Sequence, residues 1–295
     1  MAVEVSPRSA REELLRRLSL ADALHELVPP VNMCVGGVVV AIRADDAPSL
    51  GLLVHAFAPF LVGRGVPAAA RVDLRVDRTP GIWTDRSPEP HAQVGDRTIA
   101  VEHRDFVGVL STAGNHMVVV HPRHKLAIEN ALRVLYSLLL MRHDGLLLHA
   151  AGVVRDPGAT VAFGSSGSGK TTVARMARGR ALLGDDLVAL RRTRDGWCAS
   201  ATPFGGELAK GRRNRTARLH ELFRLRQGAA FGVRPMAGAR GVSELLQSVV
   251  LPAALDDDRR AAFARCAQLQ EEVGVQELTF PLDNGLWRWL DGRTG

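Results

Sequence analysis

The chain has 295 residues, of which 46% are hydrophobic, enough apolar material for a buried core and for two domains. Its formal net charge of +7 comes from 38 Lys and Arg against 31 Asp and Glu, with the arginines spread along the chain. This balance favours anionic ligands. Because only 5% of the residues are aromatic, a base-stacking surface is not expected, and we predict no nucleic-acid partner.

The cysteines and apolar segments indicate the compartment. Cys34, Cys198 and Cys266 show neither a paired metal spacing nor the even count of a disulfide framework. The apolar stretch Leu132–Val154 is interrupted by charged residues too early for a membrane span, and the N-terminal residues lack the apolar segment of a secretory signal. We therefore expect a cytoplasmic protein that does not engage a membrane.

The first half of the chain predicts one helix and then short strands. Leucines at helical spacing predict a helix over Ala10–Leu27. Between Val31 and His121, apolar runs separated by Pro, Gly and Asp predict a small sheet-based domain without a chemical motif. We assign residues 1–144 to this β-rich α+β domain, whose role the sequence leaves open. The predicted strands are Val38–Ile42, Val72–Val76, Ile99–Val101 and Met117–Val120.

The second half, residues 145–295, has the pattern of an α/β domain. A helix over Lys125–Met141 and a turn at Asp144-Gly145 precede it. Two strands follow, Leu146–Val154 and Thr160–Phe163, and then a glycine-rich loop and a helix that begins near Thr171. A strand, a loop and a helix in this order form the context that a phosphate-binding motif requires.

The loop itself matches the pattern G-x-x-x-x-G-K-[ST] at every fixed position. Its glycines let the backbone curl so that N–H groups and the positive end of the following helix hold phosphate oxygens. We expect Lys170 to reach the β- and γ-phosphates of ATP and the Thr171 hydroxyl to ligate Mg²⁺. The alternative is a flexible glycine turn. The predicted nucleotide-binding residues are Gly164, Ser165, Ser166, Gly167, Ser168, Gly169, Lys170, Thr171 and Thr172.

Two adjacent carboxylates, Asp185 and Asp186, follow an apolar run and begin 15 positions after Lys170. This interval is similar to that of small kinases, in which one short helix joins the loop to the acidic strand. One carboxylate is expected to hold the metal and the other to accept the proton of an attacking hydroxyl, with the two roles left open. The alternative is a surface turn of the Gly-Asp-Asp type.

Two further features have both a functional and a structural interpretation. His149 lies in an apolar strand, where a histidine is most often a hydrogen-bonded core residue, although an active-site role is the alternative. The basic segment Lys210–Arg218 either clamps phosphates or an acidic acceptor, or forms a solvated mobile loop. Its basic residues are Lys210, Arg212, Arg213, Arg215 and Arg218, with Arg224 beyond.

Residues 146–290 resemble the C-terminal kinase domain of the HPr kinase/phosphorylase family. The resemblance rests on Leu148-His149-Ala150 before the loop, on the loop, and on the short step to Gly184-Asp185-Asp186. It implies a fold like the nucleotide-binding part of phosphoenolpyruvate carboxykinase. It also implies that His149 and the acidic pair, with Lys170, take part in phosphoryl transfer, and that Glu207 joins Thr171 and Asp185 at magnesium.

The chain differs from the bifunctional members of that family in two places. Thr171-Thr172 stand where those enzymes have Ser-Glu after the lysine, and the segment 208–215 replaces a glycine-rich stretch. These differences put phosphorylase activity and HPr as the acceptor in question. Members of the family form rings, which leaves a homo-oligomer open.

The sequence therefore predicts an ATP- and Mg²⁺-dependent kinase that transfers the γ-phosphoryl group to a hydroxyl, with serine of a protein or peptide as the expected acceptor. Two alternatives remain. A small-metabolite kinase similar to those acting on shikimate or gluconate explains the 15-residue interval equally well. A protein that senses ATP without turnover would not need the acidic pair as a proton acceptor.

Overall fold

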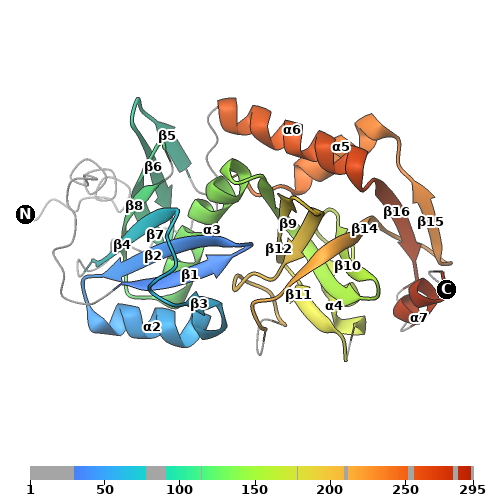
Figure 1. Ribbon diagram of the computed structural model, residues 1–295, viewed down its shortest axis with the longest axis horizontal. Helices are drawn as coiled ribbons and strands as arrows, with labels where there is room; N and C mark the ends of the chain where they lie inside the picture. Colours follow the sequence, from blue (N-terminus) through green and yellow to red (C-terminus); the bar gives the residue numbers. More distant parts are fainter. Residues whose placement is uncertain are drawn as a thin grey trace, which may run out of the picture. The chain divides into compact units, whose positions relative to one another are not determined.

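The computed structural model describes residues 30–77, 91–113, 115–177, 179–208, 212–251, 256–281 and 285–293. It shows a mixed α/β protein with two mixed eight-stranded sheets (Figure 1). The chain divides into two compact units. Unit 1 takes residues 1–139 and 251–255, and unit 2 takes residues 140–250 and 256–295. The predicted helix over Ala10–Leu27 lies outside the described residues.

Unit 1 contains one sheet with the strand order β3-β1-β2-β4-β8-β7-β6-β5. Its central pairs β2–β4 and β4–β8 are parallel, and the other neighbours are antiparallel. The four predicted strands are confirmed as β2, β4, β6 and β8. The strands are β1 (Val31–Val35), β2 (Val38–Ala44), β3 (Leu61–Val62), β4 (Ala70–Val76), β5 (His91–Val94), β6 (Thr98–His103), β7 (Phe106–Ser111) and β8 (His116–His121).

Helices complete unit 1. The helix α2 (Ala47–Phe57) was not predicted, although Asp46 caps it by accepting a hydrogen bond from the Ser49 backbone N–H at 2.8 Å, and a 3₁₀ turn, η1 (Ala58–Phe60), follows it. The predicted second helix is confirmed as α3 (Lys125–Arg142). Its Tyr136 hydroxyl donates to the Met33 carbonyl at 2.7 Å, which ties the helix to β1.

In unit 1, polar side chains from neighbouring strands of the sheet surround a buried carboxylate. The carboxylate of Asp73 on β4 is fully buried and accepts hydrogen bonds from Arg43 at 2.8 and 3.1 Å. The His116 ring lies 2.8 Å from it and Arg71 lies 3.3 Å from it. Burial by itself raises the pKa of Asp73, but these hydrogen bonds and charges outweigh it, so the pKa lies below its ordinary value.

Unit 2 contains the second sheet, in which five strands pair in a closed circuit, β10-β9-β12-β13-β14 and back to β10. The strand β14 pairs in parallel with β10 and β16, and the other pairs are antiparallel. The strands are β9 (Gly145–Arg155), β10 (Gly158–Phe163), β11 (Ala181–Gly184), β12 (Leu187–Thr193), β13 (Gly196–Ser200), β14 (Thr216–Gln227), β15 (Gly232–Pro235) and β16 (Val275–Phe280).

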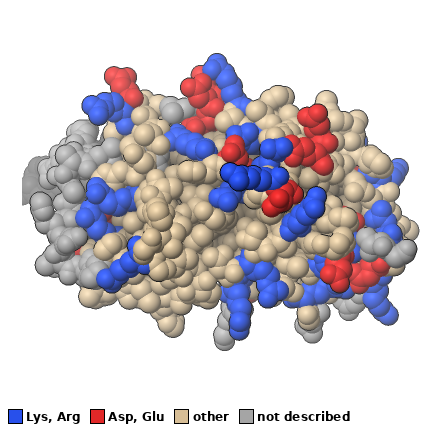
Figure 2. Space-filling model, in the orientation of Figure 1, with Lys and Arg blue, Asp and Glu red and all other residues tan. Residues whose placement is uncertain are grey.

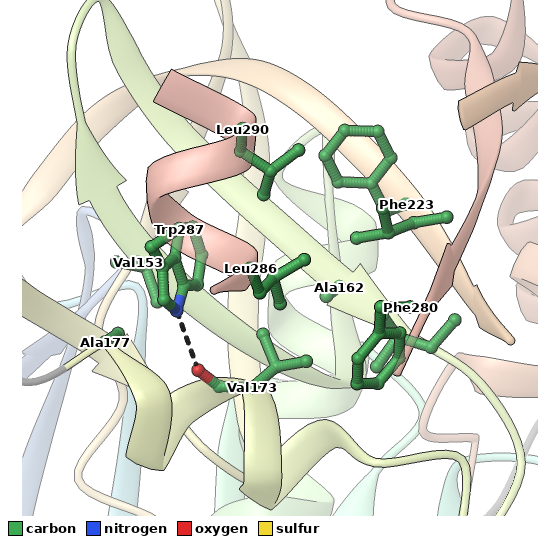
Figure 3. Close-up of a cluster of buried hydrophobic side chains, with 11 residues drawn as sticks. Val153, Ala162, Val173, Ala177, Phe223, Phe280, Leu286, Trp287 and Leu290 are labelled. Atoms are coloured by element: carbon green, nitrogen blue, oxygen red, sulfur yellow. Dashed lines mark hydrogen bonds between the residues drawn. The ribbon is translucent and has the colours of Figure 1, made fainter. Parts of the chain in front are cut away.

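The helices of unit 2 are α4 (Lys170–Met176), α5 (Gly238–Ser248), α6 (Asp256–Glu272) and α7 (Leu286–Asp291), and α5 and α6 lie side by side (Figure 1). The predicted helix start near Thr171 is thus confirmed. Figure 3 shows that α4 and α7 share a buried apolar cluster with β10, β14 and β16. Within it, the Trp287 indole N–H donates to the Val173 carbonyl at 3.0 Å. The packing of this cluster and the hydrogen bond from Trp287 hold the short helix α4 in place.

The surface and the cysteines agree with the composition. Figure 2 shows acidic and basic side chains interspersed over the visible face. Among the described residues, Cys34, Cys198 and Cys266 form no disulfide. No helix in the described ranges is both long and apolar enough to cross a membrane.

Candidate functional site

The register of β9 brings the three predicted motifs together. Phe163, the last residue of β10, pairs with Ala150 of β9, and Leu187, the first residue of β12, pairs with His149. The Ala150 backbone N–H also donates to the carbonyl of Asp186 at 2.9 Å. Three features therefore lie at adjoining positions along β9. They are His149 itself, the loop that follows β10, and the acidic pair that precedes β12.

The side chains of Phe280 and Gln227 lie close to the backbone of the glycine-rich loop. Gly169 has a φ of 104°, and a Cβ atom there would lie 2.8 Å from the Phe280 ring, so both its conformation and its neighbour require glycine. On the other side, the Gln227 amide donates to the Gly167 carbonyl at 2.9 Å. Gln227 was not predicted as a site residue because it lies at the end of β14, far from the motif in sequence.

Lys170 begins α4 and folds back over the loop. Its ammonium group donates to the carbonyls of Gly164 at 2.8 Å and Ser165 at 3.0 Å. Burial lowers the pKa of Lys170, and the negative charge of Asp186 offsets part of that effect. A cation is thus held at the loop, next to a carboxylate.

A first cavity of about 560 Å³ opens beside the loop. Within the loop, the Ser168 hydroxyl is buried without a hydrogen-bond partner among the described residues. An anion that carries acceptor oxygens could accept a hydrogen bond from the Lys170 ammonium group, which lines the cavity. The cavity is lined by Ser166, Gly167, Gly169, Lys170, Thr171, Thr172, Asp185, Asp186, Gly206, Glu207 and Gln227.

Asp185 is buried, which differs from the alternative of a surface turn. Only 2% of the residue is exposed, and its carboxylate accepts hydrogen bonds from Arg212 at 2.5 Å and from the Leu208 backbone N–H at 2.9 Å. Arg212 in turn donates to the carbonyls of Thr202 at 2.9 Å and Phe204 at 3.2 Å. Asp185 therefore connects the acidic pair to the basic segment.

Asp186 and His149 face each other across a short gap. The His149 Nδ1 atom lies 3.9 Å from an Asp186 carboxylate oxygen, too far for a hydrogen bond but within ion-pair range. The side chain of His149 is 50% exposed, whereas its neighbours in β9 are buried. His149 is therefore not the buried core histidine of the alternative interpretation.

A second cavity of about 580 Å³ adjoins the first, and the two share Ser166, Lys170 and Asp186. Its far wall comes from α5 and β14, where Arg224 donates to Glu244 at 3.2 Å. The sequence gives no local signal for this wall, because it forms only when α5 docks beside β9. The remaining lining residues are His149, Gly164, Ser165, Arg224, Glu244, Gln247 and Ser248.

The residues predicted to hold magnesium line the first cavity, but each reaches it from a different segment. Thr171 is on α4, Asp185 is in the bend before β12, and Glu207 is a largely exposed residue that forms an ion pair with Arg175. In the part of the chain that the structure describes, no three His, Cys, Asp or Glu side chains are grouped as a metal cluster. Oxygen donors that line one cavity, with water completing the shell, are the kind of partial protein coordination typical of magnesium.

Neither a comparison with protein-family models nor one with curated proteins found a match.

Proposed function

We propose that the protein is an ATP-dependent kinase that transfers the γ-phosphoryl group to a hydroxyl, with serine of a protein or peptide as the acceptor. In this proposal residues 145–295 form a domain similar to the HPr kinase/phosphorylase family, with the nucleotide-binding fold of phosphoenolpyruvate carboxykinase. The observation that carries it is the shared wall of the two cavities. Lys170 and Asp186 both line the cavity beside the loop and the cavity beside His149.

A shared wall of this kind suits transfer between two bound molecules. The donor phosphates would lie in the first cavity against the loop and Lys170, and the acceptor would enter the second cavity. A cation and a carboxylate at the junction then meet the two needs of the reaction. The cation neutralises charge on the moving phosphoryl group, and the carboxylate takes a proton.

The proposed reaction balances as a simple displacement. Asp186 accepts the proton of the acceptor hydroxyl, whose oxygen forms a bond to the γ-phosphorus while the bond from that phosphorus to the bridging oxygen breaks and ADP leaves. We assign the base to Asp186 because it lines both cavities, whereas Asp185 is buried against Arg212.

His149 and the magnesium residues have supporting roles in the proposal. His149 lies 3.9 Å from Asp186 and would orient that carboxylate or the acceptor hydroxyl. Thr171, Asp185 and Glu207 would hold Mg²⁺, which supplies positive charge next to the phosphates when it is bound. Asp185 also keeps Arg212 in place, so its loss is expected to disturb both the metal site and the basic segment.

The proposal is tested with γ-labelled ATP and magnesium, on the wild type and on Asp186→Asn, against cell extract separated into protein and small-molecule fractions. We expect label in the protein fraction from the wild type and about 10²–10⁴-fold less from Asp186→Asn. ATP affinity of this variant, measured by calorimetry, should change little because the loop is intact. Asp195→Asn, an exposed carboxylate in the β12–β13 turn, is the matched control.

The other outcomes separate the remaining hypotheses. Label that appears only in the small-molecule fraction and depends on Asp186 would replace the protein acceptor with a metabolite. ATP binding that is lost in Lys170→Ala, together with no Asp186-dependent transfer to either fraction, would contradict the kinase and favour an ATP sensor. An unchanged ATP affinity in Lys170→Ala would contradict the hypothesis that ATP binds at the glycine-rich loop.

A further inference from the structure

A third cavity, of about 500 Å³, lies along α4, β11 and the basic segment, and it shares no lining residue with the two cavities described above. Its described lining contains five arginines and no carboxylate. We call it the arginine pocket. It is lined by Ala174, Arg175, Ala177, Gly179, Arg180, Ala181, Leu182, Leu208, Arg212, Arg213 and Arg215.

Three of the five arginines already hold a carboxylate. Arg175 pairs with Glu207, Arg180 pairs with Asp291 at 2.5 Å, and the buried Arg212 pairs with Asp185 at 2.5 Å. Arg180 also lies over the Trp287 ring, 5.7 Å from its centroid, which further fixes its position. These arginines are therefore oriented by the fold.

The other two, Arg213 and Arg215, are exposed, and their side chains make no hydrogen bond or ion pair with any residue that the structure describes. They are nevertheless attached to a fixed backbone. Arg212 is anchored immediately before them, and the Arg215 carbonyl accepts a hydrogen bond from the Ala201 N–H at 2.8 Å. Two guanidinium groups thus face a cavity with an excess of positive charge.

We propose that the arginine pocket is a binding site for a small organic anion, separate from the glycine-rich loop. A guanidinium presents planar, paired donors that match a phosphate or a carboxylate, and Arg213 and Arg215 can supply them from the rim. Small and apolar residues of α4, of its C-cap and of β11 also line the pocket, namely Ala174, Ala177, Ala181 and Leu182. The ligand therefore combines one or two anionic groups with a compact apolar body.

The experiment uses phenyl phosphate and phthalate as probes, because each joins a ring to a phosphate or to two carboxylates. Binding is measured by calorimetry at low salt on the wild type and on Arg213→Gln/Arg215→Gln. We expect at least one probe to bind the wild type and to lose about tenfold or more in affinity in the double variant. The tighter probe identifies phosphate or carboxylate as the preferred group.

Two controls isolate the pocket. Arg234→Gln/Arg288→Gln removes the same charge from exposed arginines elsewhere in unit 2, and it should leave probe affinity within about twofold. Lys170→Ala disables the loop, and it should also leave probe affinity unchanged if the site is separate. This arm keeps the inference independent of the proposed kinase activity. Thermal unfolding of each variant checks that it is folded.

Several results would overturn the inference. They are the absence of binding by both probes, binding that survives Arg213→Gln/Arg215→Gln, and binding that disappears in Lys170→Ala. The last would mean that the anion sits on the loop. If neither probe binds and Arg213→Gln/Arg215→Gln loses affinity for ATP, the arginine pocket is part of the nucleotide site. That result would also refute a separate anion site.

Discussion

Both units of the molecule contain a buried aspartate that pairs with arginine, Asp73 in unit 1 and Asp185 in unit 2, and these two sites differ in what surrounds them. In unit 1, Asp73 is enclosed by Arg43, Arg71 and His116 within the sheet. In unit 2, Asp185 is held by Arg212, but it lines a cavity, and the next residue, Asp186, lines two. A buried ion pair therefore does not by itself indicate function.

The difference follows from where the carboxylates lie in the sheets. Asp73 is in the middle of β4, and both neighbouring strands continue past it. Asp185 and Asp186 lie between β11 and β12, where pairing with β9 is interrupted and side chains can face open space. The interruption of the pairing, rather than the charge, makes unit 2 the unit with a candidate site.

The largest expected effect comes from removing each buried charge. Asp73→Asn leaves Arg43, Arg71 and His116 around a neutral amide, and Asp185→Asn leaves the buried Arg212 unpaired. Each should lower the free energy of unfolding by about 3–5 kcal/mol, measured by urea denaturation. Only Asp185→Asn should also weaken phosphoryl transfer under conditions where the variant is folded. A comparable loss of transfer in folded Asp73→Asn would break the comparison.

A second test uses His121 at the end of β8 in unit 1. Burial lowers its pKa to about 4, with Asp46 raising it and Arg123 lowering it by smaller amounts. The unfolded chain binds a proton near pH 6.5 whereas the folded chain does not until about pH 4, so stability falls as the pH falls through this window. The total loss is about 3 kcal/mol.

His121→Gln should remove this part of the pH dependence, measured by denaturation at several pH values between 7 and 4. His55→Gln, at an exposed position of α2, is the matched control and should leave the dependence as in the wild type. If the wild type and His121→Gln lose stability in parallel as the solution is acidified, the buried histidine is not responsible.

The smallest effect is expected at Gly206, which closes over Asp185. Its φ is 85°, and a Cβ atom there would lie 1.9 Å from an Asp185 carboxylate oxygen. Gly206→Ala should cost about 1–3 kcal/mol in unfolding free energy and displace Asp185, which lowers transfer. Gly274→Ala has a similar φ of 77° with its nearest atom 3.9 Å away, so it reports the backbone strain alone. Equal costs in the two variants would show that the contact with Asp185 is unimportant.

Two strands beside the candidate site could be predicted because they are continuous apolar runs bounded by turn residues. Leu146–Val154 and Thr160–Phe163 were predicted within two residues of β9 and β10. The helix α2 was missed: no element was predicted over its residues, which lie between strands and contain Pro48 and Gly51. Its signals were Asp46 as the cap and Pro48 in the first turn.

The site was only partly predictable for a physical reason. The loop, the acidic pair and His149 are local patterns with fixed spacing. The ion pairs Arg212–Asp185 and Arg175–Glu207, and the wall formed by Arg224 and Glu244, join segments far apart in the chain. Their contacts depend on strand register and helix docking, for which single residues carry no sequence signal. The kinase activity itself stays a prediction.

The glycine-rich loop and α4 contact residues near the C-terminal end of the chain, which the ribosome synthesises much later than the loop. Phe280 packs against Gly169, and Trp287 binds the carbonyl of Val173, 114 residues earlier in the chain. Helix α4 has only seven residues, too few to persist without tertiary contacts. At about 5–20 residues per second, the emerging loop waits roughly 6–23 s for its supports. The glycine-rich loop of the nascent chain is therefore expected to reach its folded conformation last, after most of both sheets has been synthesised.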